Sequence, residues 1–409
     1  MEDQIKWVFN QRARNKGLKS SLDFLSVDEI KKVVNFHKSF PQYQVTPLRS
    51  LSRLAEYAGV GGIYVKDESY RFGLNAFKVL GGTYAIGRYL AGRLNTDISD
   101  ISFDKLKMPE IKQRLGEITF ISATDGNHGR GVAWAAQQLG QKAVIYMPKG
   151  SALVRLENIK AIGAEGYITD LNYDDTVRLA AGNAEKYGWV IVQDTAWEGY
   201  YDIPTWIMQG YATMAAEALD QLNGMGVDKP THIFVQAGVG ALAGAMQGYF
   251  ASIFGEFRPV IAIVEPNKAD CLYKSALAGD GRPRAVTGDM NTIMAGLACG
   301  EPNPIGWNIL WDYSDMFISC PDYIAAMGMR ILGYPLGEDP RVVSGESGAV
   351  TTGILMEIQK NDGLKEIKDL LGLDRNSRIL VFSTEGDTDP GIYRNIVWDG
   401  KYPSCKCEG

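Results

Sequence analysis

The chain has 409 residues, of which 45% are hydrophobic and 22% are charged, and its formal net charge is −6. Because a single hydrophobic core rarely grows beyond about 250 to 300 residues, this length predicts two domains. The negative charge argues against binding to nucleic-acid phosphates. The sequence has no apolar run of the roughly 18 residues that a membrane span needs, and its first residues are acidic where a signal peptide is basic. We therefore expect a cytoplasmic protein without a nucleic-acid or membrane partner.

The first predicted element that carries chemistry is a strand over residues 63–66, followed by a polar turn and by residues 75–82, Asn-Ala-Phe-Lys-Val-Leu-Gly-Gly. This segment places Lys78 at the start of a helix. A lysine can carry an aldehyde cofactor as a Schiff base when its surroundings lower its pKa, and the neighbours Phe77 and Val79 are compatible with that. Taken alone, a solvent-exposed helix lysine is the commoner situation, so the remaining motifs decide between the two.

From residue 118 onwards, short apolar runs alternate with helical stretches. Within these runs apolar residues do not alternate with polar ones, which is typical of parallel strands that are covered on both faces. The predicted strands are residues 118–122, 143–147, 166–169 and 189–193, and the predicted helices are residues 129–139, 154–162 and 176–187. This is a βαβ series.

A second series of the same kind follows. It comprises helices at residues 205–222, 242–254 and 349–360, and strands at residues 233–236, 260–264 and 379–382. The expected fold is α/β, with two doubly wound parallel-sheet domains that bind ligands at the carboxyl ends of strands. We place the smaller domain at residues 81–204, inserted between residues 1–80 and 205–409 of the larger one. Residues 280–345 are rich in glycine and proline, have no assigned elements and are interpreted as a lid or a dimer arm.

Two glycine-containing motifs follow predicted strands. Residues 123–129, Ala-Thr-Asp-Gly-Asn-His-Gly, place Asn127 where a helix N-cap is common. The second turn can direct backbone N–H groups and the positive end of a helix toward an anion, and it is formed by Gly238, Val239, Gly240, Ala241 and Leu242. The same turn fits a dinucleotide site, with Glu265 near the spacing of a ribose-binding acid, so a nicotinamide-dependent oxidoreductase is an alternative.

Together with residues 382–387, Phe-Ser-Thr-Glu-Gly-Asp, these motifs resemble the fold type II pyridoxal 5'-phosphate (PLP) enzymes, the group of the serine and threonine dehydratases and the tryptophan synthase β-chain. The resemblance implies PLP as cofactor, a Schiff base on Lys78 and a phosphate site at residues 238–242. It also implies a hydrogen bond from Asn127 to the ring hydroxyl, and Ser383 or Thr384 at the pyridine nitrogen. Glu346 begins a Glu-Ser-Gly-Ala element that this group has near the ring. A homodimer and a small amino-acid substrate are further implications.

Two aspartates depart from the dehydratase pattern. Asp125 stands where dehydratases have a small hydroxyl residue, and Asp194 follows another predicted strand of the smaller domain. An acid there would attract an ammonium group or act as a base, although a helix cap for Asp125 and a turn for Asp194 are ordinary alternatives. The resemblance to ammonia-lyases of this group implies α,β-elimination of 2,3-diaminopropionate to pyruvate and ammonia. Lys78 would then deprotonate the L-isomer, and Asp125 the D-isomer.

Other functions stay open at this point. The motifs also suit another β-eliminating enzyme of the group, such as a serine or threonine dehydratase, and a noncatalytic amino-acid-binding protein could use the same two domains. Metal binding is not expected, because the three histidines and the terminal pair Cys405 and Cys407 lack the pattern of a zinc site. Cys271, Cys299 and Cys320 have no disulfide-framework spacing and are expected to be thiols, with a local pair left open.

Overall fold

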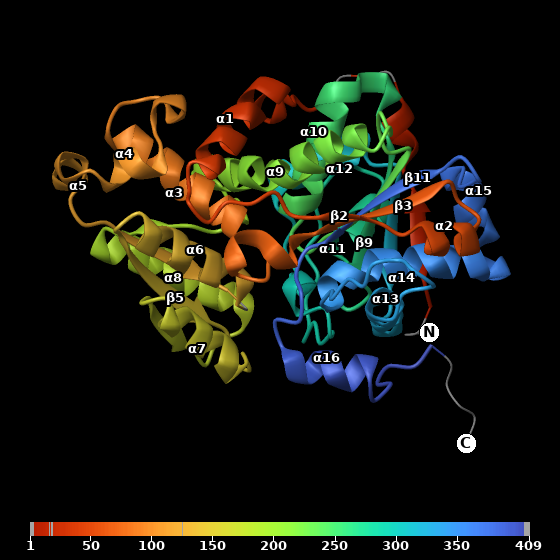
Figure 1. The fold of residues 1–409 in the computed structure, drawn as a ribbon. Helices are drawn as coiled ribbons and strands as arrows, with labels where there is room; N and C mark the ends of the chain where they lie inside the picture. Colours follow the sequence, from red (N-terminus) through yellow and green to blue (C-terminus); the bar gives the residue numbers. More distant parts are fainter. Residues whose placement is uncertain (1–3, 16, 18, 125, 405–409) are drawn as a thin grey trace. The chain divides into compact units, whose positions relative to one another are not determined.

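The computed structural model describes residues 4–15, 17, 19–124 and 126–404, and Figure 1 labels its elements. The chain packs as two compact units. The large unit is built from Met1–Ser26, Val45–Tyr70 and Met214–Gly409, and the small unit from Val27–Gln44 and Arg71–Thr213. The expected division at residues 80 and 204 assigned residues 27–44 to the larger domain. Instead, helix α1 (Val27–Lys38) packs against α3 (Val79–Arg93) of the small unit.

The large unit contains a seven-stranded sheet in the order β1-β10-β9-β8-β11-β3-β2. The five inner strands run parallel, as predicted, whereas both edge strands run antiparallel to their neighbours. The chain returns from β2 to β3 through one short helix, a connection briefer than a parallel crossover needs. The bounds are β1 (Lys6–Phe9), β2 (Leu48–Ser50), β3 (Gly62–Asp67), β8 (His232–Gln236), β9 (Val260–Pro266), β10 (Met316–Cys320) and β11 (Arg378–Ser383).

Helices cover both faces of this sheet. In Figure 1, α10 and α12 lie on one side and α13 and α14 on the other. The helices of the unit are α2 (Ser52–Ala58), the end of α9 (Asp202–Gly224), α10 (Ala241–Phe254), α11 (Cys271–Ala278), α12 (Pro304–Tyr313), α13 (Asp322–Gly333), α14 (Glu346–Lys360), α15 (Lys365–Leu371) and α16 (Pro390–Val397). Short 3₁₀ helices are η1 (Gln11–Arg14), η2 (Asp23–Leu25), η5 (Gly255–Phe257), η6 (Ala295–Leu297) and η7 (Asp362–Leu364).

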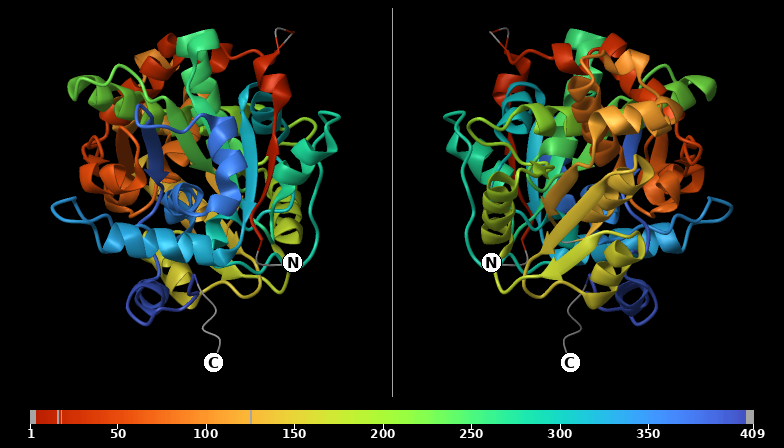
Figure 2. Two further views of the ribbon diagram at one scale, coloured as in Figure 1. Left: turned by 90° about the vertical axis from the view of Figure 1, so that its right-hand side faces the viewer. Right: turned by 90° about the vertical axis from the view of Figure 1, so that its left-hand side faces the viewer.

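The interpretation of residues 280–345 as a lid or a dimer arm is wrong for much of the segment. It contains α12, β10 and α13, and β10 is a fully buried strand of the large sheet. Helices α13 and α14, which can be followed in blue in Figure 2, approach closely because glycines line their contact. A Cβ atom on Gly328 would lie 2.0 Å from the carbonyl oxygen of Ala349. The glycines that concealed the helical pattern are therefore the residues that allow the packing.

The small unit contains a parallel four-stranded sheet in the order β6-β5-β4-β7. Its strands are β4 (Thr119–Ala123), β5 (Lys142–Met147), β6 (Glu165–Ile168) and β7 (Val190–Ile191). Its further helices are α4 (Phe103–Lys107), α5 (Pro109–Leu115), α6 (Asn127–Gln138), α7 (Leu153–Ala161), α8 (Tyr173–Tyr187), the start of α9 and the 3₁₀ helix η4 (Ile98–Asp100), while η3 (Glu68–Gly73) spans the change of unit. The predicted βαβ series is confirmed, although β7 is shorter than expected because the chain leaves the sheet before Asp194.

The three thiols that the sequence left open, Cys271, Cys299 and Cys320, are not in disulfides. Cys271 and Cys320 are buried, and burial raises the pKa of both thiols. Cys405 and Cys407 lie outside the described residues. In the part of the chain that the structure describes, no helix is long and apolar enough to cross a membrane.

Candidate active site

Lys78 is the residue immediately before helix α3 of the small unit. Its side chain is 18% exposed, and its Nζ lies 2.7 Å from Oδ2 of Asp194. The neighbouring Phe77 is buried, with its ring centroid 5.9 Å from the same Nζ. The lysine therefore lies among buried groups and differs from the solvent-exposed helix lysine that was its ordinary interpretation.

Asp194 is buried and lies just beyond β7. Its Oδ2 accepts hydrogen bonds from Lys78 Nζ and, at 3.3 Å, from the hydroxyl of Tyr211 on α9. Burial alone would raise the pKa of Asp194, but the charges of Lys78 and His128 and these two hydrogen bonds outweigh it and lower the pKa to about 2. The ionised carboxylate beside the lysine supports a functional interpretation of Asp194 over the turn-forming one.

Hydrogen bonds fix the chain on the way to Asp194. The Gln193 side chain accepts a bond from the backbone N–H of Ala123 at 3.2 Å, which ties this segment to the end of β4. His128 Nε2 lies 2.9 Å from the carbonyl oxygen of Val192, and since an oxygen can only accept, this nitrogen carries the proton. His128, which the sequence analysis gave no role, thus helps to place the residue two positions before Asp194.

The ordinary interpretation of Asn127 as the N-cap of helix α6 is wrong. Asn127 is the first helical residue, and the N-cap is Gly126, whose φ of 151° favours glycine. The hydroxyl of Thr124 accepts hydrogen bonds from the amides of Gly126 and Gly129, at 2.9 and 3.0 Å. Thr124 therefore accepts the amide hydrogen bonds that an N-cap at Asn127 would have accepted. The contact of Asn127 with a cofactor ring stays a prediction. Asp125 lies outside the described residues.

The glycine turn of the large unit has the form of an anion site. Gly240 is the N-cap of α10, with a φ of 94° and no side-chain cap. The first amides of a helix have no intrahelical acceptor, and the positive end of the helix dipole lies there. Gly238 also needs to be small, because a Cβ atom at this position would lie 3.2 Å from Cα of Leu297. The turn can thus present bare backbone N–H groups to a phosphate.

A second group of the large unit gathers where β11 ends. Helix α14 begins against this strand end, because a Cβ atom on Gly348 would lie 2.8 Å from the backbone nitrogen of Thr384. Glu346, Ser383 and Thr384 are all buried there. Gln236 Nε2 donates to Oγ1 of Thr384 at 2.8 Å, while Oγ of Ser383 donates to the carbonyl oxygen of Glu385 at 3.5 Å.

Ser347 is a residue of this group that the sequence analysis quoted without a role. Its Oγ is buried and has no hydrogen-bond partner within the described residues. Buried hydroxyls are normally bonded, so such an atom fits a polar group of a ligand. The only sequence signal for it was its place in the Glu-Ser-Gly-Ala element.

The chemistry of the two sets of residues fits PLP. The small unit supplies an amine for an aldehyde, in Lys78, and a carboxylate beside it. The large unit supplies helix-terminal amides suited to a phosphate, together with buried hydroxyls suited to a ring nitrogen. The groups lie in different units, and each has the local geometry described above.

The structure argues against the dinucleotide site, because Glu265 is not available as its ribose-binding acid. Glu265 is fully buried, and its two carboxylate oxygens accept hydrogen bonds from the amides of Leu272 and Tyr273, at 2.9 and 2.6 Å. Burial raises the pKa of Glu265 well above its usual range. The residue is thus occupied in fixing the start of α11, which argues against a ribose-binding role.

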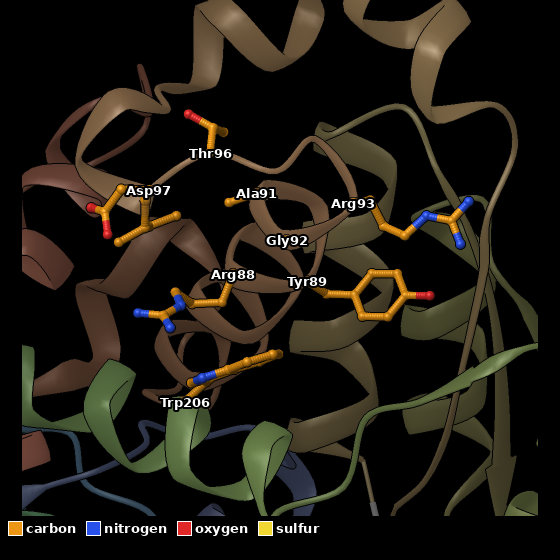
Figure 3. A pocket seen from close by; sticks show the side chains of 9 residues that line it. Arg88, Tyr89, Ala91, Gly92, Arg93, Thr96, Asp97 and Trp206 are labelled. Atoms are coloured by element: carbon orange, nitrogen blue, oxygen red, sulfur yellow. The ribbon is translucent and has the colours of Figure 1, made fainter.

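A surface pocket of about 280 Å³ lies in the small unit, near the end of α3 (Figure 3). The Arg88 guanidinium lies 5.3 Å from the ring centroid of Trp206. The lining consists of Arg88, Tyr89, Ala91, Gly92, Arg93, Thr96, Asp97, Ile98 and Trp206. This lining contains none of the predicted site residues, so the pocket is separate from the residues around Lys78.

Comparison with known proteins agrees with the site chemistry. Residues 40–371 match the model of the pyridoxal-phosphate-dependent enzyme family, and the chain belongs to this family. Among its relatives is the diaminopropionate ammonia-lyase of Salmonella typhimurium, which is 54% identical over 98% of this chain and 100% of the relative.

Solved structures agree with this relative. The holo diaminopropionate ammonia-lyase of Escherichia coli is 51% identical, with a TM-score of 0.90 over 98% of each chain. The same enzyme in complex with an aminoacrylate-PLP azomethine reaction intermediate is 51% identical, with a TM-score of 0.88 over 98% of each chain. The chain is therefore similar, over nearly its whole length, to a PLP enzyme that eliminates ammonia, and the expected fold type is confirmed.

Proposed function

We propose that this protein is a PLP-dependent ammonia-lyase that converts 2,3-diaminopropionate and water to pyruvate and two molecules of ammonia, by α,β-elimination of one ammonia and hydrolytic release of the other. The contact between Lys78 Nζ and the buried, ionised Asp194 is the observation that supports assigning this function to individual residues. A serine or threonine dehydratase acts on a hydroxyl substrate, whereas a buried anion suits a substrate with a second ammonium group. The near full-length similarity to diaminopropionate ammonia-lyases supports the same choice.

Each predicted site residue has a role in this proposal. Bound PLP draws electrons from the substrate Cα and so makes its proton removable. Lys78 holds the cofactor covalently, the amides of residues 238–242 bind its phosphate, and Asn127 donates to its ring hydroxyl. Ser383 or Thr384 faces the pyridine nitrogen, with Glu346 close to the ring. The Thr384 hydroxyl accepts its bond from Gln236, so its own proton stays available for that nitrogen, and either hydroxyl can make this contact.

The acids and the lysine divide the proton transfer and the substrate binding between them. Lys78 Nζ takes the Cα proton of the L-isomer, which requires the lysine to leave Asp194. Asp194 then holds the second ammonium group of the substrate. Asp125, on the sequence argument alone, takes the Cα proton of the D-isomer from the opposite face.

The test of this proposal replaces the lysine. Lys78→Ala is expected to lower pyruvate release from 2,3-diaminopropionate to background, because it removes the covalent attachment and one base. Lys142→Ala is the matched control, since Lys142 is exposed and forms an ion pair with the exposed Glu117. After borohydride reduction of the native protein, mass spectrometry should locate the cofactor on the peptide that contains Lys78. A cofactor adduct on another lysine would disprove the assignment.

A further inference from the structure

Tyr211 lies beside Lys78 and Asp194 and has none of the roles proposed above. Tyr211 lies on α9 and is fully buried. Its ring centroid lies 4.7 Å from that of Phe77, the residue before Lys78. Its hydroxyl lies 3.3 Å from Oδ2 of Asp194, the same oxygen that Lys78 contacts.

The packing of two helices holds Tyr211 in this place. A Cβ atom on Gly81 would lie 2.6 Å from the Tyr211 ring, and a Cβ atom on Gly210 would lie 2.5 Å from the carbonyl oxygen of Leu80. Only glycine at both positions lets α3 and α9 come this close. The start of α3, where Lys78 lies, and the Tyr211 hydroxyl are thereby fixed against each other.

We propose that Tyr211 is a positioning residue, whose hydroxyl holds the Asp194 carboxylate in place to recognise the second ammonium group of the substrate. This inference rests on the proposed function. Lys78 changes partners during the reaction, because it bonds the cofactor and accepts a proton. Tyr211 has no such second task and keeps its hydrogen bond to Asp194 while the lysine is engaged elsewhere.

The ionisation of Tyr211 agrees with a donor role. Burial, with the negative charge of Asp194 opposing the positive charge of Lys78, raises the pKa of the phenol well above its usual range. The hydroxyl therefore stays protonated throughout the neutral range. A carboxylate that has lost this donor would keep its charge at neutral pH but would lose one restraint on its orientation.

The test compares Tyr211→Phe with Tyr84→Phe. Tyr84 is equally buried, on α3, and its ring packs against Phe36 and His37, so its variant controls for the loss of a buried hydroxyl. In Tyr211→Phe, KM for 2,3-diaminopropionate should rise roughly 10-fold or more, the usual effect of a lost bond to a charged group. The inhibition constant of serine, which has a hydroxyl in place of the second amine, should stay within about twofold of that of the native protein, since a neutral hydroxyl cannot form an ion pair with Asp194.

Several outcomes separate this inference from the proposed function. If the native protein releases no pyruvate from 2,3-diaminopropionate, the proposed function fails. The role of Tyr211 is overturned if the native protein is active and Tyr211→Phe leaves KM for diaminopropionate unchanged. It is also overturned if Tyr211→Phe weakens the binding of serine as much as that of diaminopropionate. Should Tyr211→Phe fail to fold, 3-fluorotyrosine at position 211 keeps the ring and strengthens the donor. It should lower KM for diaminopropionate and leave serine inhibition unchanged, and an equal effect on both would also overturn the role.

Discussion

At the scale of single residues, the site depends on one buried carboxylate with two donors. Asp194 keeps its charge because Lys78 and Tyr211 compensate for its burial. The sequence placed Lys78 and Asp194 near the chemistry, since each follows a predicted strand. It could not indicate Tyr211 or His128, because their contacts with Asp194 and Val192 join positions far apart in the chain. Nor could the sequence show that Thr124, rather than Asn127, accepts hydrogen bonds from the backbone amides at the start of α6.

The two aspartates should respond differently to the two isomers of the substrate. Asp125→Asn keeps the shape of the side chain but cannot accept a proton, so activity on D-diaminopropionate should fall by roughly a hundredfold or more. The L-isomer should lose distinctly less, because Lys78 deprotonates it. Steady-state kinetics on both isomers measures the difference. Equal losses for the two isomers would mean that Asp125 only positions the substrate.

Asp194→Ala should weaken the binding of both isomers alike, because a carboxylate that binds the second ammonium group can do so for either isomer. The variant also breaks the ion pair between Lys78 and Asp194, and breaking a largely buried ion pair destabilises a protein by about 3 to 5 kcal/mol. Kinetics should therefore be measured below the unfolding temperature of the variant, established by a thermal melt. Unchanged kinetics in a folded Asp194→Ala would return this residue to a turn-forming role.

At the scale of elements, the turn between β8 and α10 links a sequence pattern to a binding function. The strand, the glycines and the helix start were predicted from the sequence, and the structure adds the positive φ of Gly240. Edge strand β1 and helix α13 escaped prediction for physical reasons. β1 is short and only partly buried, and the closeness of α13 and α14 depends on glycines that interrupt a helical pattern.

Gly240→Val should impair PLP binding. A β-branched residue strains a backbone with positive φ, and its Cβ atom would lie 3.3 Å from Leu272. We expect the dissociation constant of PLP, measured by fluorescence titration of the cofactor-free protein, to rise roughly 10-fold or more.

Gly372→Val is the matched control for this change. Gly372 has a φ of 71° at the end of α15, and a Cβ atom there would meet nothing within 4 Å. The control should lose stability without losing PLP affinity. An equal loss of affinity in both variants would show that backbone strain, and not the turn itself, is responsible. Saturable NADH binding to the native protein would instead favour the oxidoreductase.

At the scale of the whole molecule, the chain builds each unit from separated segments. The sequence indicated two α/β domains, one inserted into the other, from length and from the βαβ series. It did not indicate that α1 belongs with the small unit, because that depends on packing between α1 and α3 rather than on any local pattern. The homodimer implied by the family resemblance stays a prediction. Sedimentation at micromolar concentration should give twice the mass of one chain, and a monomer that is fully active would contradict it.

The ratio of products formed by the native protein tests the proposed function most directly. Elimination from 2,3-diaminopropionate releases two ammonia for each pyruvate, whereas serine yields one ammonia for each pyruvate and threonine yields none of this keto acid. We predict pyruvate from diaminopropionate with an ammonia to pyruvate ratio of two, and a much lower kcat/KM for serine and threonine. Absence of pyruvate from diaminopropionate, or a higher kcat/KM for serine, would contradict the proposed function.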